Sequence, residues 1–289
     1  MLAAGRAAER GRKVLLLEKN KELGKKLSQT GGGRCNILNA ETDEHKLLAH
    51  FGEAAKFLYS PFSQHSMQDS WDFFTNQGLP LVVEARQRAF PESMSAPDVT
   101  QTLRRYMIAH NVEIKTKNPV LEMNTTADEV SSVKTKDGNI YTADSYILAT
   151  GGESHQETGS TGESFAWLED MGYRVHEPQP NIVPLVVEDK WVTDLSGTTL
   201  SFMKITFAVD REKEKKDIPG RFSVTGKLLF THFGLSGPLI LNSAHKVKKL
   251  LEAGPVETTI DMFPDTEIGT VRNRVLEAFL RNKNKTLKN

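Results

Sequence analysis

The apolar and polar pattern at the start of the chain predicts a helix followed by a short strand. Residues 2–10 are rich in alanine and arginine, which are good helix formers, and Gly11 stands where a glycine ends a helix. Residues 14–17 form a continuous apolar run, typical of a strand buried on both faces of a sheet. Glu18 follows directly. This order is that of the second half of a βαβ unit.

Further periodic segments predict helices over residues 41–60 and 63–78, the second ending at Gly78. Another helix is expected over residues 99–110, with Asp98 as its cap after Pro97.

Alternating residues between 120 and 148 predict strands, with Asp137-Gly138-Asn139 as a hairpin turn. The last strand is expected to run through residues 147–149 into a second glycine-rich segment, ATGGESHQETGSTGES. Strands and helices together predict an α/β domain.

The residue pattern of the sequence changes near residue 180, where three prolines indicate a linker. The runs IVPLVV, SFMKITFAV and KLLFTHF predict strands, and the charged REKEKKD between two of them predicts an exposed hairpin or loop. Ser236-Gly237-Pro238 predicts the start of a helix that reaches about Leu251. We therefore expect a first domain over residues 1–180 and a second, mainly β domain with late helices over residues 181–289.

Composition narrows the possible partners. The chain has 37 lysines and arginines and 37 aspartates and glutamates, so its formal net charge is zero. A chain without net charge has no overall electrostatic attraction for nucleic acid or an anionic membrane. One cysteine excludes an internal disulfide framework and fits a reducing compartment. The apolar runs are too short to span a bilayer. We expect a cytoplasmic protein with a small-molecule substrate and neither nucleic acid nor membrane as partner; the oligomeric state stays open.

Glu18 is the first candidate for a ligand contact. In dinucleotide-binding folds an acidic residue after the second strand accepts hydrogen bonds from the ribose hydroxyls, and Glu18 has that position. The GxGxxG fingerprint that accompanies such a residue is not present, and a plain surface glutamate is the alternative.

The stretch SQTGGGRCN contains three consecutive glycines, Gly31 to Gly33. Glycines let backbone N–H groups approach a pyrophosphate or a flat ring, and the guanidinium of Arg34 adds several N–H donors suited to anions. A flexible surface loop is an equally good interpretation. Cys35 has no partner thiol for a redox cycle, so we interpret it as a small buried residue beside a cofactor.

The ATGG at 149–152 and the GSTG at 159–162 form a second region of bare backbone. Two glycine clusters at strand ends fit ligand binding at the carboxyl edge of a parallel sheet. The eight histidines show no metal-binding spacing; among them, His232 in THFGLSGP is the first to test. No GxSxG nucleophile elbow is present.

Several stretches together resemble one family: LGKKLSQTGGGRCNILN, RAFPESMSAPDV, ILATGGES with TGSTG, and LLFTHFGLSGPLIL. They are similar to bacterial FAD-dependent oxidoreductases of the aminoacetone-oxidase-like type, which include flavoproteins implicated in reduction of bile-acid intermediates. The resemblance implies an FAD-binding Rossmann-like domain, interrupted by a β-barrel-like domain that carries a small helical insertion.

The resemblance also implies a set of cofactor contacts. Glu18 would hold the adenosine ribose, with Lys19 beside it. The flavin and its pyrophosphate would be lined by Thr30, Gly31, Gly32, Gly33, Arg34, Cys35 and Asn36. Thr150, Gly151 and Gly152 would approach the cofactor from a strand end.

The sequence departs from the family pattern in two places. The family tends to have an aromatic-proline pair where His155-Gln156 stand, and Asp-Gly where Glu163-Ser164 stand. Family members also begin with a strand and a glycine loop before the first helix, and continue past the helical insertion. We therefore expect this chain to be a fragment that binds FAD poorly, and a form extended at both ends to bind it well.

Three functions remain open from the sequence. The first is an FAD-dependent oxidoreductase that moves electrons between NADH or NADPH and a small organic acceptor or oxygen. The second is a nucleotide-binding module without turnover. The third is a flavin-dependent RNA-modifying enzyme, which would need a basic surface that the balanced charge argues against. No catalytic side chain or metal ligand is assigned.

Overall fold

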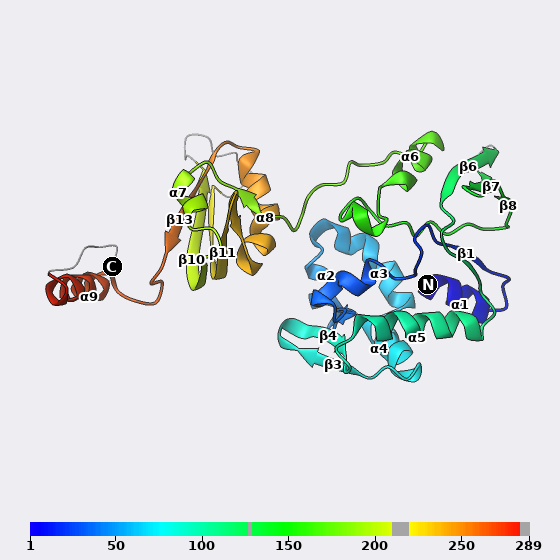
Figure 1. The fold of residues 1–289 in the computed structure, drawn as a ribbon, viewed down its shortest axis with the longest axis horizontal. Coiled ribbons are helices and arrows are strands. Elements are labelled where there is room, and N and C mark those ends of the chain that lie inside the picture. The colour runs from blue at the N-terminus through cyan, green and yellow to red at the C-terminus, as the bar shows by residue number, and fades with distance from the viewer. Residues whose placement is uncertain (127–128, 210–219, 284–289) are drawn as a thin grey trace. The chain divides into compact units, whose positions relative to one another are not determined.

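The computed structural model describes residues 1–126, 129–209 and 220–283. Contacts along the chain define two compact units, Met1–Glu177 and Pro178–Asn289 (Figure 1). The units divide three residues before the predicted domain boundary at residue 180, which stays a prediction. No helix among the described residues is long and apolar enough to cross a membrane.

The first unit begins as the sequence predicts, with helix α1 (Leu2–Glu9) and strand β1 (Leu15–Leu17). Gly11 follows the end of the helix at a left-handed φ of 81°. Strand β1 pairs in parallel with β5 (Glu113–Lys115), Leu16 lying opposite Ile114. The expectation of full burial is wrong: β1 is half-buried, because β5 is its one partner strand among the described residues.

Helix α5 (Ala96–Ala109) is the centre of the first unit's core. It begins three residues earlier than predicted, with Ser95 rather than Asp98 at the N-cap. Proline lacks an N–H that the first turn would leave unpaired, so Pro97 lies inside the helix and Asp98 falls in its first turn. Tyr106 packs under α1, where a Cβ on Gly5 would lie 2.4 Å from its ring.

Shorter helices surround this core. The predicted helix over 41–60 is divided near Gly52, whose φ is +56°, and the one over 63–78 ends before Gly78. These helices are α2 (Glu44–Ala49), η2 (Gly52–Ala54), α3 (Ala55–Gln64) and α4 (Met67–Asn76). The remaining helical turns of this unit are η1 (Leu27–Gly32), η3 (Ala85–Gln87), η4 (Gln156–Thr158) and α6 (Glu163–Asp170).

Two small antiparallel sheets complete the first unit. One has the order β2-β4-β3, formed by β2 (Leu38–Asn39), β3 (Leu81–Glu84) and β4 (Arg88–Pro91). The other has the order β6-β7-β8, formed by β6 (Val120–Thr126), β7 (Glu129–Thr135) and β8 (Ile140–Tyr141). The predicted turn at Asp137 is confirmed: its carboxylate accepts hydrogen bonds from Thr135 and Asn139.

The predicted strand through residues 147–149 is wrong. Strand β8 ends at Tyr141, and residues 142–149 are irregular, with Ile147 67% exposed. A strand is stable only when its backbone groups pair with a neighbour, and β7 pairs with this segment only at residues 140 and 141. The ATGG motif therefore follows an irregular segment rather than a strand.

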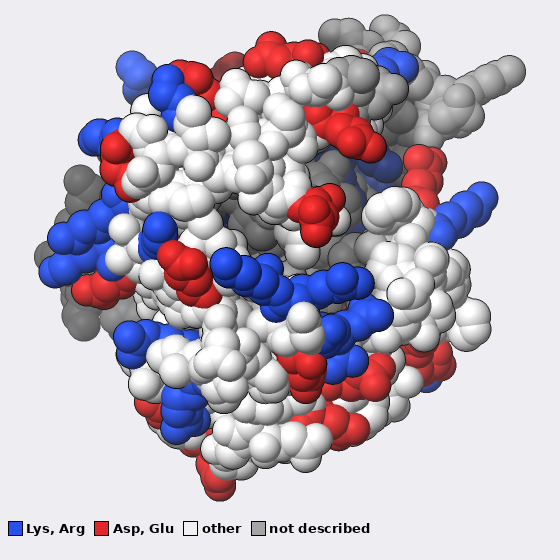
Figure 2. All heavy atoms as spheres, turned by 90° about the vertical axis from the view of Figure 1, so that its right-hand side faces the viewer, with Lys and Arg blue, Asp and Glu red and all other residues white. Residues whose placement is uncertain are grey.

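Charge is spread rather than concentrated on the face shown in Figure 2. Acidic and basic side chains alternate over this face, with one run of basic side chains across its middle. The mixture agrees with the equal numbers of acidic and basic residues in the chain.

The second unit is mainly β, as predicted, and contains a five-stranded antiparallel sheet of order β13-β10-β11-β12-β9. Its strands are β9 (Leu185–Val186), β10 (Thr199–Val209), β11 (Arg221–Thr231), β12 (Gly234–Ser236) and β13 (Val256–Asp261). Its helices are α7 (Lys190–Asp194), α8 (Pro238–Leu251) and α9 (Ile268–Arg281). The predicted REKEKKD loop lies outside the described residues.

Alternation along β10 builds the core of the second unit. Ile205 and Phe207 are fully buried and pack with Leu228 of β11 and Ile240 of α8. A bulge between Leu200 and Met203 breaks this register.

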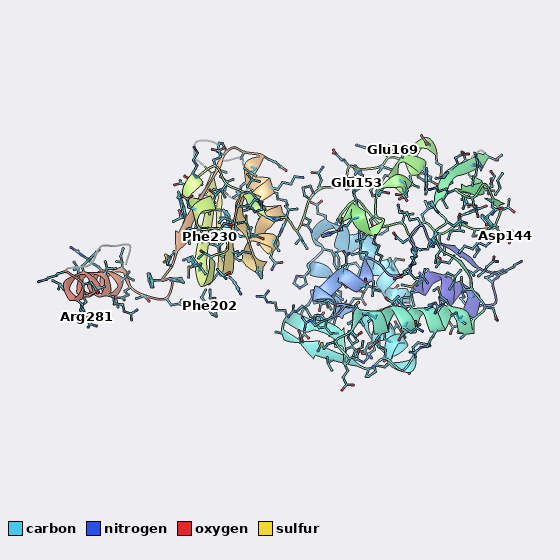
Figure 3. The ribbon with its side chains drawn as sticks, viewed as in Figure 1. Asp144, Glu153, Glu169, Phe202, Phe230 and Arg281 are labelled. Atoms are coloured by element: carbon cyan, nitrogen blue, oxygen red, sulfur yellow. The ribbon has the colours of Figure 1, made fainter. Side chains whose placement is uncertain are left out.

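At the bulge, Phe202 has a left-handed φ of 59° and is 77% exposed. Phe230 on the neighbouring strand is only 2% exposed (Figure 3). The bulge therefore turns one aromatic ring outward while the rest of the strand keeps its apolar side in the core.

The THFGLSGP motif has a structural explanation. A Cβ on Gly234 would lie 2.1 Å from the carbonyl oxygen of Leu185, so only glycine lets β12 approach β9. Gly237 has a φ of 94° and precedes Pro238, which begins α8 as predicted. His232 is exposed in the turn and contacts the ring of Phe233.

Replacing Gly234 with alanine should lower the free energy of unfolding by about 2 to 4 kcal/mol, because the methyl group overlaps Leu185 and forces the two strands apart. Gly269→Ala is the matched control, since a Cβ there meets nothing within 4 Å and alanine favours the helix. Chemical denaturation followed by circular dichroism measures both. Equal stability of Gly234→Ala and wild type would contradict the packing argument.

Candidate functional site

Glu18 lies at the carboxyl edge of the two parallel strands. Its N–H donates to Lys115 O at 2.9 Å, and its own carbonyl accepts from the N–H of Asn118 at 3.0 Å. The carboxylate Oε1 accepts from the backbone N–H and the side-chain Nδ2 of Asn20, both at 2.8 Å. Glu18 thus has the predicted position, with a carboxylate fixed by the turn that follows it.

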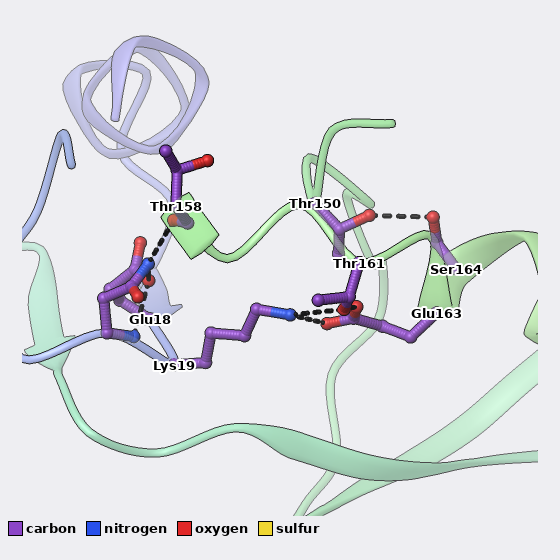
Figure 4. A network of polar contacts seen from close by, with 8 residues as sticks. Glu18, Lys19, Thr150, Thr158, Thr161, Glu163 and Ser164 are labelled. Atoms are coloured by element: carbon purple, nitrogen blue, oxygen red, sulfur yellow. Dashed lines mark hydrogen bonds and ion pairs between the residues drawn. The ribbon is translucent and has the colours of Figure 1, made fainter. Parts of the chain in front are cut away.

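Lys19 points across to a distant part of the chain (Figure 4). Its Nζ donates to Thr161 Oγ1 at 2.9 Å and to Glu163 Oε1 at 2.5 Å. Thr161 Oγ1 in turn donates to the second oxygen of Glu163. The side chains of Lys19 and Glu163 are 26% and 27% exposed, so this ion pair is largely shielded from solvent.

The environment of Glu163 acts on its acidity in two directions. Burial of the carboxyl would raise its pKa, but the hydrogen bonds from Lys19 and Thr161 outweigh burial and bring the pKa below its ordinary value. Glu163 is therefore a carboxylate at neutral pH, and its charge is matched by Lys19.

Three further contacts join the same two segments. Asn20 Nδ2 donates to Thr158 O at 3.0 Å, Lys26 Nζ donates to Ser154 O at 2.7 Å, and Lys25 Nζ donates to Glu157 O. We call residues 18–26 the edge loop and residues 150–164 the glycine-rich loop. The edge loop thus holds the glycine-rich loop at four points.

Most glycines of the glycine-rich loop are required by its own shape. Gly151, Gly159 and Gly162 have left-handed φ values, and a Cβ on each would lie within 2.7 Å of a neighbouring side-chain atom. Gly152 differs from them: its φ is not left-handed, and a Cβ there would meet nothing within 4 Å. Thr150, at the base of the loop, donates to Ser164 Oγ at 2.8 Å.

The first glycine cluster forms a kinked turn at the end of η1. Gly31, Gly32, Gly33 and Cys35 all have left-handed φ values, between 58° and 85°. A Cβ on Gly31 would lie 2.9 Å from Asn36 N, whereas those on Gly32 and Gly33 would meet nothing within 4 Å. Gly33 O accepts from the N–H of Ala96, which fastens the turn to the start of α5.

Arg34 is engaged with protein partners. Its Nη1 lies 2.8 Å from Glu84 Oε1, its Nε donates to Gly31 O, and its guanidinium lies 4.3 Å from the ring centroid of Phe90. The predicted contact between Arg34 and an anion stays a prediction, and such an anion would share the guanidinium with Glu84.

Cys35 is buried, as the sequence predicts, with 4% of its surface exposed. It packs in the core with Leu81, Val99 and Leu103. Burial raises the pKa of its thiol, although a hydrogen bond with Thr30 acts in the opposite direction. Thr30 and Asn36 on either side are exposed.

A groove of about 420 Å³ opens between the edge loop and α5. Residues 20–23, Lys25 and Ser28 line one side, and Pro97, Thr100 and Gln101 line the other. The groove begins two residues after Glu18, and none of the predicted cofactor contacts lies in its lining.

The structure also shows site residues that the sequence analysis missed, namely Asn20, Lys25, Lys26, Thr158, Thr161 and the partner role of Glu163. Their contacts join residues more than 120 positions apart, so no local pattern reveals them. Within the described parts of the chain, no cluster of three His, Cys, Asp or Glu side chains is arranged to hold a metal ion.

Fold and site together define a class: an α/β protein with a parallel strand pair, an acidic residue at the carboxyl edge and two glycine-rich turns, which are features of Rossmann-like nucleotide-binding domains. The chain belongs to the HI0933-like protein Rossmann domain family, whose model matches residues 1–283. The predicted α/β fold class with a Rossmann-like domain is therefore confirmed.

Two curated proteins and one solved structure are similar to this chain. The chain is 28% identical over 260 residues to a 3-dehydro-bile acid delta(4,6)-reductase from Clostridium scindens, covering 90% of this chain and 60% of that protein. It is 24% identical over 289 residues to a ribosomal RNA dihydrouridine synthase from Escherichia coli, covering 100% of this chain and 66% of that protein. The chain therefore spans less than two thirds of the length of these curated relatives.

Among solved structures, an L-amino acid deaminase from Proteus vulgaris aligns with a TM-score of 0.34 and 13% identity, covering 92% of this chain and 76% of that one.

Cys35 should react with a disulfide reagent at pH 8 at least about 100-fold more slowly in the folded protein than in denaturant, because its thiol is buried and its raised pKa lowers the thiolate fraction. Cys35 is the one cysteine of the chain, so the absorbance of the thiol that the reagent releases reports the reaction rate of Cys35 alone. Rapid stoichiometric reaction of the folded protein would show that Cys35 is accessible.

Proposed function

We propose that the protein is a flavin-dependent oxidoreductase that binds FAD at the carboxyl edge of β1 and β5. Three glycines support this proposal, because a Cβ on Gly32, Gly33 or Gly152 would meet nothing within 4 Å. Bare backbone beside open space is what a pyrophosphate or a flavin ring requires. Gly152 is the observation that carries the proposal, because neither its φ nor its packing requires glycine.

The residues at this edge suit the parts of a flavin dinucleotide. Glu18 would accept the ribose hydroxyls through its carboxylate, which now accepts from Asn20. The exposed turn at Gly31–Gly33 would face the pyrophosphate, and Gly151 and Gly152 would lie beside the ring system. The local residues therefore fit FAD, and the fit extends the family's Rossmann fold to a particular ligand.

The names of the relatives support a substrate class. One is named a reductase of the delta(4,6) double bonds of a 3-dehydro-bile acid, and the other produces dihydrouridine, which is uridine with its ring double bond reduced. In both cases the reduced carbon–carbon double bond is conjugated to a carbonyl. We propose the same class here. FAD, when bound, would supply the electron pair, drawn from NADH or NADPH and delivered as hydride to one alkene carbon while a proton reaches the other.

Two acceptors fit this chemistry. A small unsaturated ketone or acid is supported by the reductase from C. scindens and by the balanced charge of the chain. A uridine in RNA is supported by the dihydrouridine synthases, and Figure 2 shows a run of basic side chains that a phosphate backbone would need. We favour the small acceptor, since acidic residues flank that run.

Gly152→Ala should weaken FAD binding about 10-fold or more without changing the stability of the protein, because the added methyl group meets ligand and no protein atom. Quenching of flavin fluorescence measures the dissociation constant of FAD for each variant. Gly269→Ala is the control, with equally open space around its Cβ and no place in the site. Unchanged FAD affinity in Gly152→Ala, or no FAD binding by the wild-type chain, would overturn the proposed site.

The FAD-loaded protein should oxidise NADH or NADPH without oxygen when given an α,β-unsaturated ketone, and not when given its saturated analogue. Loss of absorbance at 340 nm, followed anaerobically, measures this, and uridine-containing RNA in place of the ketone tests the second acceptor. FAD binding without turnover of any acceptor would instead support a nucleotide-binding module. Turnover with oxygen alone would assign an oxidase.

A further inference from the structure

The glycine-rich loop has little internal support. Apart from the single turn of η4, residues 150–162 have no regular secondary structure. The bond between Thr150 and Ser164 closes the loop at its base. Left-handed residues such as Gly151 and Gly159 fold it back on itself. A loop of this kind needs contacts from outside to hold one conformation.

Those contacts come from the edge loop. Asn20, Lys25 and Lys26 donate to main-chain carbonyls of the glycine-rich loop. Lys19 is different, because it meets a charged side chain, Glu163, at the first residue of α6. The pair is about three quarters buried, so water screens it less than it screens an exposed pair.

Main-chain hydrogen bonds fix the Lys19 end of the ion pair. Glu18, the residue before Lys19, donates its N–H to Lys115 of β5 and accepts at its carbonyl from Asn118, which follows that strand. Gly159 packs directly on this region, since a Cβ there would lie 3.2 Å from Lys19 Cε and 2.6 Å from Asn20 Nδ2. The strand edge therefore anchors Lys19, and Lys19 anchors the loop that carries Gly152.

We propose that Lys19 and Glu163 are positioning residues, whose ion pair holds the glycine-rich loop so that Gly152 and Glu18 face the same dinucleotide. This inference rests on the proposed FAD site. It assigns Lys19 a role different from the predicted contact beside the ribose, because its ammonium is occupied by Thr161 and Glu163. Neither residue touches the cofactor.

Two substitutions at one position separate charge from size. Glu163→Gln keeps the length of the side chain and removes its charge, and it leaves Lys19 largely buried without a counter-ion. Glu163→Asp keeps the charge and shortens the side chain by one methylene. Glu122→Gln is the matched control, because Glu122 pairs with Lys134 at 2.9 Å on a sheet outside the site.

We expect Glu163→Gln to accelerate amide hydrogen exchange in residues 150–163 and to weaken FAD binding about 5- to 20-fold. Glu163→Asp should restore most of the protection and most of the affinity, and Glu122→Gln should change neither. Exchange measured by mass spectrometry reports on the loop without cofactor, and flavin fluorescence reports on the affinity.

Wild-type exchange rates over residues 150–163 in Glu163→Gln would overturn the positioning role, whatever happens to FAD. Faster exchange with an unchanged FAD dissociation constant would overturn it as well, since the loop would move without consequence for the ligand. If the wild-type protein binds no FAD, the proposed function fails; loss of protection in Glu163→Gln with rescue in Glu163→Asp would then still support the anchoring of the loop.

Discussion

The parallel pairing of β1 with β5 is the interaction on which the candidate site depends. Parallel strands end at the same edge of a sheet, so the residues that follow them meet there. The pairing continues past the strands: Glu18 exchanges main-chain bonds with Lys115 and Asn118, and Lys117 N–H donates to Asn20 O. This ladder fixes the edge loop, and the edge loop fixes the glycine-rich loop through side chains of residues 19–26.

Glycine serves two structural purposes in this chain. At Gly31 and Gly151 the backbone turns into a conformation that other residues rarely adopt. At Gly234 the absence of a Cβ lets two strands of the second unit come together. Gly152 meets neither condition, so its bare backbone has no explanation inside the folded chain. The backbone φ and the space around the Cβ together distinguish Gly152, a residue of the proposed site, from the glycines of the same loop that the fold requires.

Two cationic side chains near the candidate site already have carboxylate partners in the protein. Arg34 pairs with Glu84 and stacks on Phe90, and Lys19 pairs with Glu163. These pairings matter for the proposed chemistry, because a flavin dinucleotide would then be held mainly by backbone groups and by Glu18 rather than by cationic side chains. Redox chemistry would come from the cofactor, and the protein would supply orientation.

The sequence by itself determined the elements whose signals are local: the helix before Gly11, the strand before Glu18, the turn at Asp137 and the helix that begins at Pro238. It also determined the burial of Cys35 and the presence of a Rossmann-like domain, since both follow from short stretches of residues. Local patterns were wrong about the N-cap of α5. They were also wrong about a strand at residues 147–149, because pairing with a neighbouring strand decides whether a strand forms there. Only the tertiary structure decided that Arg34 is engaged by Glu84 and that Lys19 reaches Glu163. Such contacts form between residues far apart in the chain, and their energy depends on distance and burial, which no local pattern encodes.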